Sequence, residues 1–102
     1  MTRYDKGRRL EYKTRDRLRD DGFTVVRSAG SKGPVDIVAF SAKVLRLIQV
    51  KANAAPGPAE RDVLRHLPRP PGASVEIWVW HDHASGPMVM LVGKAGVREH
   101  TP

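Results

Sequence analysis

A chain of 102 residues is long enough for one compact domain with a modest core and too short for two, so we expect a single domain over residues 1–102. The formal net charge of +7 and the pI near 10.4 indicate a polyanionic partner, with nucleic acid favoured over an acidic membrane and a basic protein without such a partner as the alternative. The absence of cysteine excludes disulfides, cysteine-ligated zinc and thiol nucleophiles, so oxygen or histidine ligands must hold any metal.

The sequence contains no targeting or membrane segment that we can identify. No stretch approaches the ~20 apolar residues that span a bilayer. The first ten residues, MTRYDKGRRL, lack the apolar core of a secretion signal. We therefore expect a cytoplasmic protein of a prokaryotic cell, with a virus-encoded protein as an open alternative, and no membrane partner.

The N-terminal part of the chain predicts a helix over residues 5–21. This segment contains good helix formers and no proline, and Leu10, Thr14 and Leu18 recur at every fourth position, which places them on one stripe of the helix. Gly22 follows the acidic end of the segment and suits the left-handed conformation that closes many helices.

Three short strands are predicted next, because β-branched and apolar runs are separated by turn residues. The predicted segments are a strand over 23–28, a turn-rich loop over 28–34, and strands over 35–40 and 43–52. The last two strands are separated by Ser41 and Ala42, so we expect them to form a hairpin.

The second half of the chain predicts a helix followed by two strands. A flexible break over 52–58 precedes a helix over 59–67, and alternating apolar residues predict strands over 74–82 and 87–93. The remaining tail carries no signal that separates a short edge strand from a loose end. The whole order predicts an α/β protein in which helices flank a mixed sheet.

Asp36, Gln49 and Lys51 are polar side chains in the predicted hairpin, whose two strands are otherwise mostly apolar. Alternate residues of a strand share a face, so Gln49 and Lys51 project together, and the hairpin brings Asp36 close to both. An acid in a segment built for burial is costly unless it is paired with a base or binds a cation. An ion pair between Asp36 and Lys51 at a sheet edge and a metal site are therefore both open interpretations.

The runs GRRLE (7–11), GFTVVRSAGSKGPVDIVA (22–39) and IQVKA (48–52) together resemble the archaeal-type Holliday junction resolvases (the Hjc group), a branch of the PD-(D/E)xK nuclease superfamily. The resemblance covers residues 4–52, and the run VVRSAGSKG is fairly specific to that group. It implies a restriction-endonuclease-like core and a single nuclease domain. It also implies Mg²⁺-dependent resolution of four-way DNA junctions by paired symmetric nicks, with Mn²⁺ as a substitute metal.

The resemblance assigns roles to individual residues. Such nucleases use an acid on the first helix, an Asp that opens one strand and an acid-x-Lys on the next strand, with Mg²⁺ between them. By this resemblance the helix acid is Glu11, the strand Asp is Asp36 and the lysine is Lys51, which would orient or deprotonate the attacking water. The phosphate-contacting arginine falls on Arg27, and the loop serine falls on Ser31.

Position 49 departs from the pattern, because Gln49 stands where the resemblance implies an acid. The amide oxygen of glutamine can still coordinate Mg²⁺ or Mn²⁺, but it adds no charge, so the metal affinity should fall unless Glu11 or a backbone carbonyl compensates. We interpret the change as a tolerated ligand variant, which leaves Asp36, Gln49 and Glu11 as the predicted metal ligands. A catalytically inactive DNA-binding protein is the alternative.

Basic residues are concentrated in the first 22 residues, which hold eight Lys and Arg and five acids. We expect some of these bases to contact the DNA backbone, whereas a solvated helix with ion pairs between neighbouring turns is the alternative. The predicted DNA-binding residues are Arg3, Lys6, Arg8, Arg9, Arg27 and Lys32. No base-reading pattern is present, which favours recognition of DNA shape.

Two further groups have competing interpretations. Trp78 and Trp80 share one face of a predicted strand, where they either stack on bases or, as we favour, form a second core face or a dimer interface. The triplet of His81, Asp82 and His83 resembles a metal site in composition, but its place at a strand end favours an exposed turn.

The approximate twofold symmetry of a four-way junction calls for two active sites related by a twofold axis, so we expect a homodimer, as the resemblance also implies. Met88 and Met90 share a strand face on which an apolar subunit contact is plausible. Three functions stay open. A junction-resolving endonuclease is favoured over a related nuclease that acts on other branched or duplex DNA and over a non-catalytic DNA-binding protein on the same fold.

Overall fold

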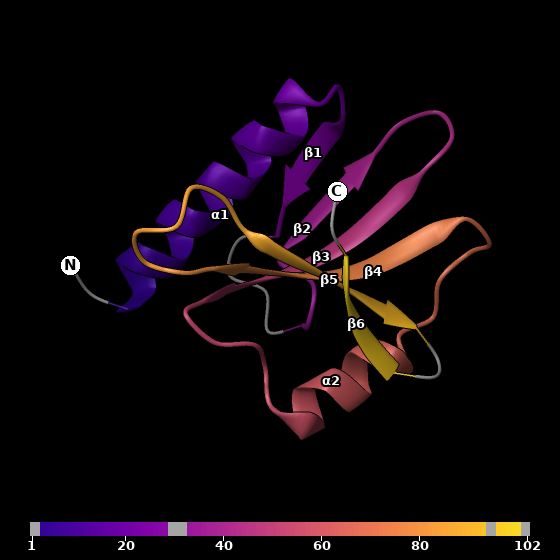
Figure 1. Ribbon diagram of the computed structural model, residues 1–102. Helices are drawn as coiled ribbons and strands as arrows, with labels where there is room; N and C mark the ends of the chain where they lie inside the picture. The colour runs from indigo at the N-terminus through magenta and orange to yellow at the C-terminus, as the bar shows by residue number, and fades with distance from the viewer. Residues whose placement is uncertain (1–2, 29–32, 94–95, 101–102) are drawn as a thin grey trace.

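The computed structural model describes residues 3–28, 33–93 and 96–100, in which two helices and six strands follow one another (Figure 1). In chain order these are α1 (Arg3–Asp20), β1 (Thr24–Arg27), β2 (Ile37–Phe40), β3 (Leu45–Ala52), α2 (Pro58–Arg65), β4 (Ala73–Trp80), β5 (Met88–Gly93) and β6 (Gly96–His100). All the predicted helices and strands are present, with ends that shift by up to two residues, and the tail forms the edge strand β6. No helix in this described part of the chain has the length and hydrophobicity needed to cross a bilayer.

One mixed sheet contains the six strands in their chain order, β1-β2-β3-β4-β5-β6. Neighbouring strands are antiparallel except for β3 and β4, which run parallel and are connected by the crossover that contains α2. Helix α1 covers one face of the sheet and α2 lies against the other (Figure 1). The predicted α/β class, with helices on both sides of a mixed sheet, is confirmed.

The stripe predicted on the first helix anchors α1 to the sheet. Leu10, Thr14 and Leu18 are buried, and the Thr14 hydroxyl donates to the Leu10 carbonyl at 2.8 Å. Gly22, with a φ of 93°, closes the helix, and the N–H of Phe23 donates back to the Leu18 carbonyl at 3.0 Å. This is the hydrogen bond of a Schellman cap, so the predicted end of the helix is also confirmed.

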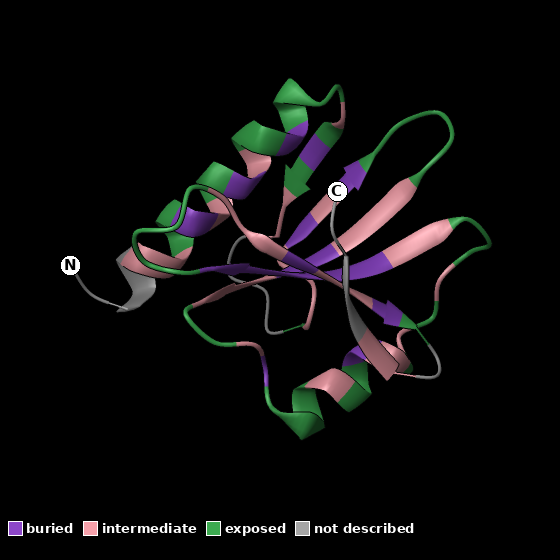
Figure 2. Ribbon diagram, in the orientation of Figure 1, coloured by how far each residue is buried: buried purple, intermediate pink, exposed green. Residues whose placement is uncertain are grey.

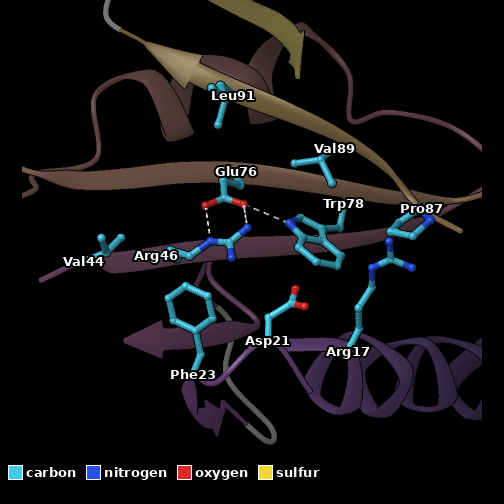
Figure 3. A pocket seen from close by; sticks show the side chains of 10 residues that line it. All are labelled: Arg17, Asp21, Phe23, Val44, Arg46, Glu76, Trp78, Pro87, Val89 and Leu91. Carbon is cyan, nitrogen blue, oxygen red and sulfur yellow. Dashed lines mark hydrogen bonds and ion pairs between the residues drawn. The ribbon is translucent and has the colours of Figure 1, made fainter. Parts of the chain in front are cut away.

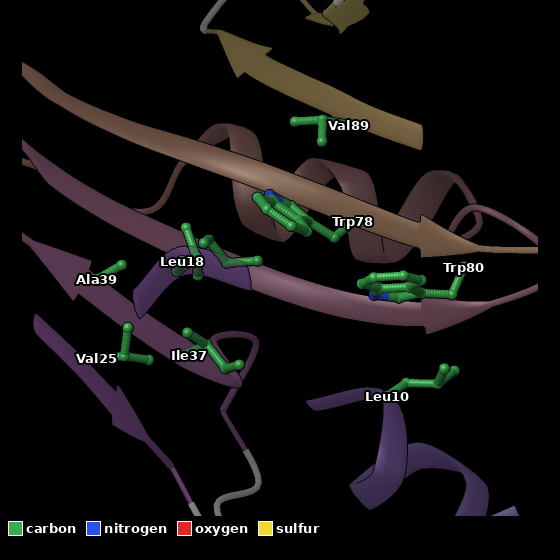
Figure 4. Close-up of a cluster of buried hydrophobic side chains, with 9 residues drawn as sticks. Leu10, Leu18, Val25, Ile37, Ala39, Trp78, Trp80 and Val89 are labelled. Carbon is green, nitrogen blue, oxygen red and sulfur yellow. The ribbon is translucent and has the colours of Figure 1, made fainter. Parts of the chain in front are cut away.

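The core between α1 and the sheet contains both tryptophans (Figure 4), and Figure 2 shows buried residues on both α1 and β4. Trp78 and Trp80 are 3% and 7% exposed, and the indole N–H of Trp80 donates to the Thr14 hydroxyl at 2.9 Å. The favoured interpretation as a second core face is therefore correct, and stacking of these rings on bases is excluded by their burial. The residues packed with them are Leu10, Leu18, Val25, Ile37, Ala39, Ile48 and Val89.

A smaller core lies on the opposite face, beneath α2. Leu64 is fully buried against Val75, Ile77, Val79 and Val92 of β4 and β5. The two methionines of β5 pack against this cluster and are partly buried. The side chains of β4 thus alternate strictly between the two cores, which fixes the register of the central strand.

The hairpin of β2 and β3 is present, but its turn is longer than predicted. The N–H of Ser41 donates to the Val44 carbonyl at 2.9 Å, and the Ser41 hydroxyl accepts from the N–H groups of Lys43 and Val44 at 3.3 Å. Because the serine hydroxyl satisfies these backbone donors, the turn extends over 41–44 and β3 begins at Leu45 instead of at residue 43.

Candidate active site

The far end of the same hairpin forms a pocket between the sheet and the start of α2. The strand register pairs Ile37 with Ile48, which places Asp36 next to Gln49. The pocket has a volume of about 480 Å³, and its lining residues are Glu11, Gly33, Pro34, Asp36, Gln49, Val50, Lys51, Glu60 and Val63. Four of the predicted site residues, from α1, β3 and the segment before β2, therefore share one cavity.

The sequence predicted a strand that begins at residue 35 and includes Asp36. In the structure, Asp36 lies one residue before β2. Its N–H donates to the Ile48 carbonyl at 2.9 Å, and its carboxylate oxygen Oδ2 accepts from the N–H of Val50 at 2.8 Å. The Asp36 carboxylate accepts the Val50 hydrogen bond that a backbone carbonyl would accept if the ladder between β2 and β3 continued. The regular strand β2 therefore begins after Asp36.

The pKa of the Asp36 carboxyl is raised above its ordinary value, first of all because burial removes water from the charged form. The Val50 hydrogen bond and the charge of Lys51 oppose this effect, whereas the carboxylates of Glu11 and Glu60 add to it. The carboxylate of Asp36 thus lies in a pocket with an incomplete set of positive partners.

Gln49 is 9% exposed, and its side-chain oxygen Oε1 is buried without a hydrogen-bond partner among the described residues. A buried carbonyl oxygen left unpaired costs about 1–3 kcal/mol of stability. Such an oxygen in a pocket that also holds a carboxylate is suited to a cation, which would satisfy its lone pairs.

Glu11 and Arg27 connect α1 to β1 at the edge of the pocket. Their charged atoms Oε1 and Nη1 are 3.1 Å apart, and each side chain is only about one-fifth exposed. The guanidinium of Arg27 also lies over the ring of Tyr12, 4.9 Å from its centre, and Arg15 lies over the same ring at 4.7 Å. Arg27 is therefore held at the site by an acid and an aromatic face.

Lys51 pairs with Glu60 of α2, with 2.9 Å between Nζ and Oε2. The sequence left open an ion pair between Lys51 and Asp36, but in the structure Lys51 pairs with Glu60 instead. Glu60 was missed by the sequence interpretation because it lies on another helix. The signal that could have found it is the short connection of Asn53–Gly57, which brings the first turn of α2 to the end of β3.

The oxygen donors of this pocket suit a hard divalent cation, although its acids are divided among ion pairs. Among the side chains that the structure describes, no three Asp, Glu, His or Cys residues are grouped to hold a metal. The carboxylates of Glu11 and Glu60 face Arg27 and Lys51, which leaves Asp36 and the amide oxygen of Gln49 as the donors without a cationic partner in the described part of the chain. The residues fit a metal that draws further carboxylates out of their ion pairs.

Residues 2–57, more than half of the chain, match the family model described as archaeal Holliday junction resolvase (hjc). This chain belongs to the archaeal Holliday junction resolvase family. Among solved structures it is similar to Archaeoglobus fulgidus Hjc, a Holliday junction resolvase from an archaeal hyperthermophile. The TM-score is 0.69, with 28% identity over 85% of this chain and 73% of that chain. A comparison with curated proteins gave no match.

Membership of the Hjc family makes this chain a structure-specific nuclease of the junction-resolving, metal-dependent class, and the structural match confirms the restriction-endonuclease-like fold. The part that matches the family holds all the predicted catalytic residues, from Glu11 to Lys51. Glu60 lies beyond it. The family resemblance could therefore not have drawn attention to Glu60.

The predicted DNA-binding residues are placed unequally. Arg8 and Arg9 are exposed on α1, and Arg8 lies one turn before Glu11 on the same side of the helix. Lys6 pairs with Asp82 at 3.0 Å. Ser31 and Lys32 lie outside the described residues, as does the side chain of Arg3, so their predicted roles stay predictions.

The His-Asp-His triplet after β4 belongs to a structural contact. Asp82 accepts hydrogen bonds from Lys6 and from the amide of Asn53, and its N–H donates to Asn53 Oδ1 at 2.8 Å. These bonds join the loop after β4 to α1 and to the loop after β3. They also hold the pKa of the Asp82 carboxyl below its ordinary value, chiefly through the bond from Lys6. The favoured interpretation as an exposed turn is consistent with this arrangement.

A second polar pocket, of about 440 Å³, lies on the α1 face of the sheet (Figure 3). Its centre is the ion pair of Arg46 and Glu76, which is bidentate with N···O distances of 2.8 and 2.7 Å. Glu76 also accepts from the Ser74 hydroxyl and from the indole N–H of Trp78. The Arg46 guanidinium lies 4.9 Å from the centre of the Phe23 ring. Sequence inspection did not identify this network.

Proposed function

We propose that this chain binds four-way DNA junctions as a homodimer and cuts two opposed strands by Mg²⁺-dependent hydrolysis, which leaves paired symmetric nicks. The observation that carries this proposal is the convergence of Asp36, Gln49 and Lys51 in one pocket that Glu11 also lines. Two acids, an amide oxygen and a lysine provide metal ligands and an adjacent cationic group, and phosphodiester hydrolysis requires both.

Asp36, Gln49 and Glu11 are the proposed ligands of Mg²⁺, for which Mn²⁺ can substitute. The bound ion supplies polarisation of the phosphate and a lower pKa for a coordinated water. Asp36 contributes a carboxylate that is fixed by the Val50 hydrogen bond, and Gln49 contributes its unpaired carbonyl oxygen. Glu11 contributes a second carboxylate once it separates from Arg27.

Lys51 orients the attacking water and offsets the negative charge that develops on the phosphate. Arg27 exchanges its partner Glu11 for an oxygen of a neighbouring phosphate, which its planar guanidinium can bind through two N–H groups. The water oxygen bonds to phosphorus as the bond to the 3′ oxygen breaks, and one proton of the water ends on that leaving oxygen. The nicked strands then carry a 5′-phosphate and a 3′-hydroxyl, which a ligase can join.

A homodimer supplies two such sites related by a twofold axis, in keeping with the approximate symmetry of the junction. The exposed Arg8 and Arg9 are proposed to contact the DNA backbone, and Lys6 does so after it separates from Asp82. The formal charge of +7 supports binding that is dominated by phosphate contacts and weakens with salt.

The test is cleavage of a labelled synthetic four-way junction beside a linear duplex of the same sequence, each with and without Mg²⁺ or Mn²⁺. Symmetric, metal-dependent nicks confined to the junction are expected. Equal cutting of the duplex would instead favour a related nuclease with another substrate. Tight junction binding without cutting in either metal would overturn the proposal in favour of a binding protein.

Two variants assign the roles within the site. Asp36→Asn and Lys51→Ala are expected to abolish cleavage while junction binding, measured by gel shift, stays close to that of the wild type. The matched controls are Asp62→Asn on the exposed side of α2 and Lys43→Ala in the hairpin turn, and both should cut normally. Loss of junction binding in both site variants would contradict the assignment.

A further inference from the structure

Glu60 is the acid of the candidate active site that neither the sequence pattern nor the family match covers. We propose that Glu60 supplies the carboxylate that is missing at position 49, so that α2 contributes an acidic ligand to the site in addition to Asp36 and Glu11. This inference rests on the proposed function, because it assigns Glu60 to the same metal-dependent site.

The charges of the pocket require such an acid. Glu11 pairs with Arg27 and Glu60 pairs with Lys51, whereas Asp36 and the neutral Gln49 make no ion pair among the described residues. A site for a divalent cation needs an excess of anionic oxygen, and among the described residues that line this pocket Glu60 provides the remaining negative charge. Without Glu60, the formal charges of Glu11, Asp36, Lys51 and the neighbouring Arg27 would sum to zero.

The position of Glu60 suits this role. It lies in the first turn of α2, which the short connection of Asn53–Gly57 carries back to the end of β3. Its carboxylate is 2.9 Å from Lys51 Nζ, and it is near enough to Asp36 to disfavour ionisation of that carboxyl. The same pocket therefore contains Glu60, Asp36 and the face of β3 that carries Gln49.

The ion pair with Lys51 does not prevent Glu60 from acting as a metal ligand. The Glu60 side chain is 53% exposed and that of Lys51 is 32% exposed, and ion pairs of such exposure contribute little to stability. A cation in the pocket can therefore draw the carboxylate away from Lys51 at little cost. The released ammonium of Lys51 is then free to act on water and phosphate.

An independent observation points to a ligand at this position. The oxygen Oε1 of Gln49 is buried and has no hydrogen-bond partner among the described residues. Gln49 lines the same pocket as Glu60. A carboxylate from α2 and an amide oxygen from β3 complement each other, since the first supplies the charge and the second a fixed neutral donor.

The experiment is an exchange of the two side chains. Mn²⁺ binding to the full, DNA-free chain is titrated by the electron paramagnetic resonance signal of free Mn²⁺, and junction cleavage is measured in parallel. Glu60→Gln is expected to weaken Mn²⁺ binding by about tenfold or more. The double variant Gln49→Glu with Glu60→Gln, which returns the carboxylate to β3, is expected to restore both binding and cleavage.

Asp62→Asn is the matched control, because this substitution removes the same charge from the same helix. Asp62 pairs with Arg65 and lies outside the pocket. Its Mn²⁺ affinity should equal that of the wild type. Wild-type affinity in Glu60→Gln would overturn the inference, even if cleavage fell, because Glu60 would then only position Lys51. A chain that binds Mn²⁺ through Glu60 but cuts no junction would contradict the proposed function and leave this inference standing.

Discussion

Two clusters of charged residues, one around Arg46 and Glu76 and one in the candidate active site, differ in how completely their polar atoms are paired. Glu76, with a side chain only 3% exposed, accepts hydrogen bonds from Ser74 and, as Figure 3 shows, from Arg46 and Trp78. In the candidate active site, by contrast, the ion pairs of Glu11 with Arg27 and of Glu60 with Lys51 are more exposed than that of Glu76 with Arg46. The oxygen Oε1 of Gln49 has no partner among the described residues. The first cluster is fully paired in the folded chain, whereas the second holds a buried oxygen without a partner among the described residues.

The two buried acids show the consequence of this difference. Burial raises the pKa of Glu76, but the hydrogen bonds from Arg46, Ser74 and Trp78 outweigh it, so the net pKa lies below the ordinary value. Burial also raises the pKa of Asp36, and there the single backbone hydrogen bond does not compensate. A buried acid whose charge is fully satisfied stabilises the fold, and one that is not satisfied is suited to a cation.

The largest effect on stability is expected from Glu76→Gln. This change leaves the half-buried Arg46 without its counter-ion and should lower the free energy of unfolding at pH 7 by about 3–5 kcal/mol, measured by urea denaturation. The penalty should shrink on acidification, because the contribution of an acid with a lowered pKa is present above its ordinary pKa and is lost as the pH falls through the folded value. A loss as small as that of the exposed control Asp62→Asn would show that the network is not structural.

The opposite behaviour is expected from Lys51→Ala. Junction cleavage should fall by about 10²–10⁴-fold, since the lysine is proposed to act on the water and the phosphate. The free energy of unfolding should change by less than about 0.5 kcal/mol because the ion pair with Glu60 is partly exposed. Lys43→Ala, which removes the same charge from the turn of the same hairpin, should leave both quantities unchanged. A large loss of stability in Lys51→Ala would contradict the distinction between the clusters.

The parts of the site that sequence reasoning predicted are those fixed by local structure. Asp36, Gln49 and Lys51 belong to one hairpin, so the alternation of strand residues was sufficient to bring them together. The spacing of Leu10 and Thr14 likewise predicted the buried stripe of the first helix, whereas Glu11 was assigned by the family resemblance alone. In each case the relevant neighbours are close in the sequence or lie on one regular element.

The parts that it missed depend on how distant elements pack. Glu60 reaches the pocket through the crossover from β3 to β4, and Lys6 pairs with Asp82, which is 76 residues away. The unpaired oxygen of Gln49 is equally invisible in a sequence, because it depends on every atom around the side chain. Conformations of this kind are set by tertiary contacts that no local pattern encodes.

A smaller effect is expected from Gln49→Met, which replaces the unpaired amide by an apolar group of similar length. The free energy of unfolding should rise by about 1 kcal/mol, because a buried oxygen without a partner is removed. Mn²⁺ binding should weaken at the same time, since the neutral donor is lost. Ser74→Ala, which removes a partner from the complete cluster, should instead lower stability. A decrease in stability for Gln49→Met would indicate that its amide is satisfied in solution.

The smallest effect is expected from the pH dependence of Asp36→Asn. The ordinary pKa of an aspartate is near 3.8, and in the fold the pKa of Asp36 is raised, chiefly by desolvation. The native state therefore holds this proton more tightly than the unfolded chain, so the contribution of Asp36 to stability is fully present below the ordinary pKa and is lost as the pH rises through the folded value.

Asparagine does not titrate and can still accept the Val50 hydrogen bond. The variant should consequently be slightly more stable than the wild type at pH 7, and the advantage should disappear between pH 7 and about pH 4. Urea denaturation of both proteins across this range measures the difference, and an advantage that is constant with pH would mean that the Asp36 carboxylate is already satisfied, as that of Glu76 is.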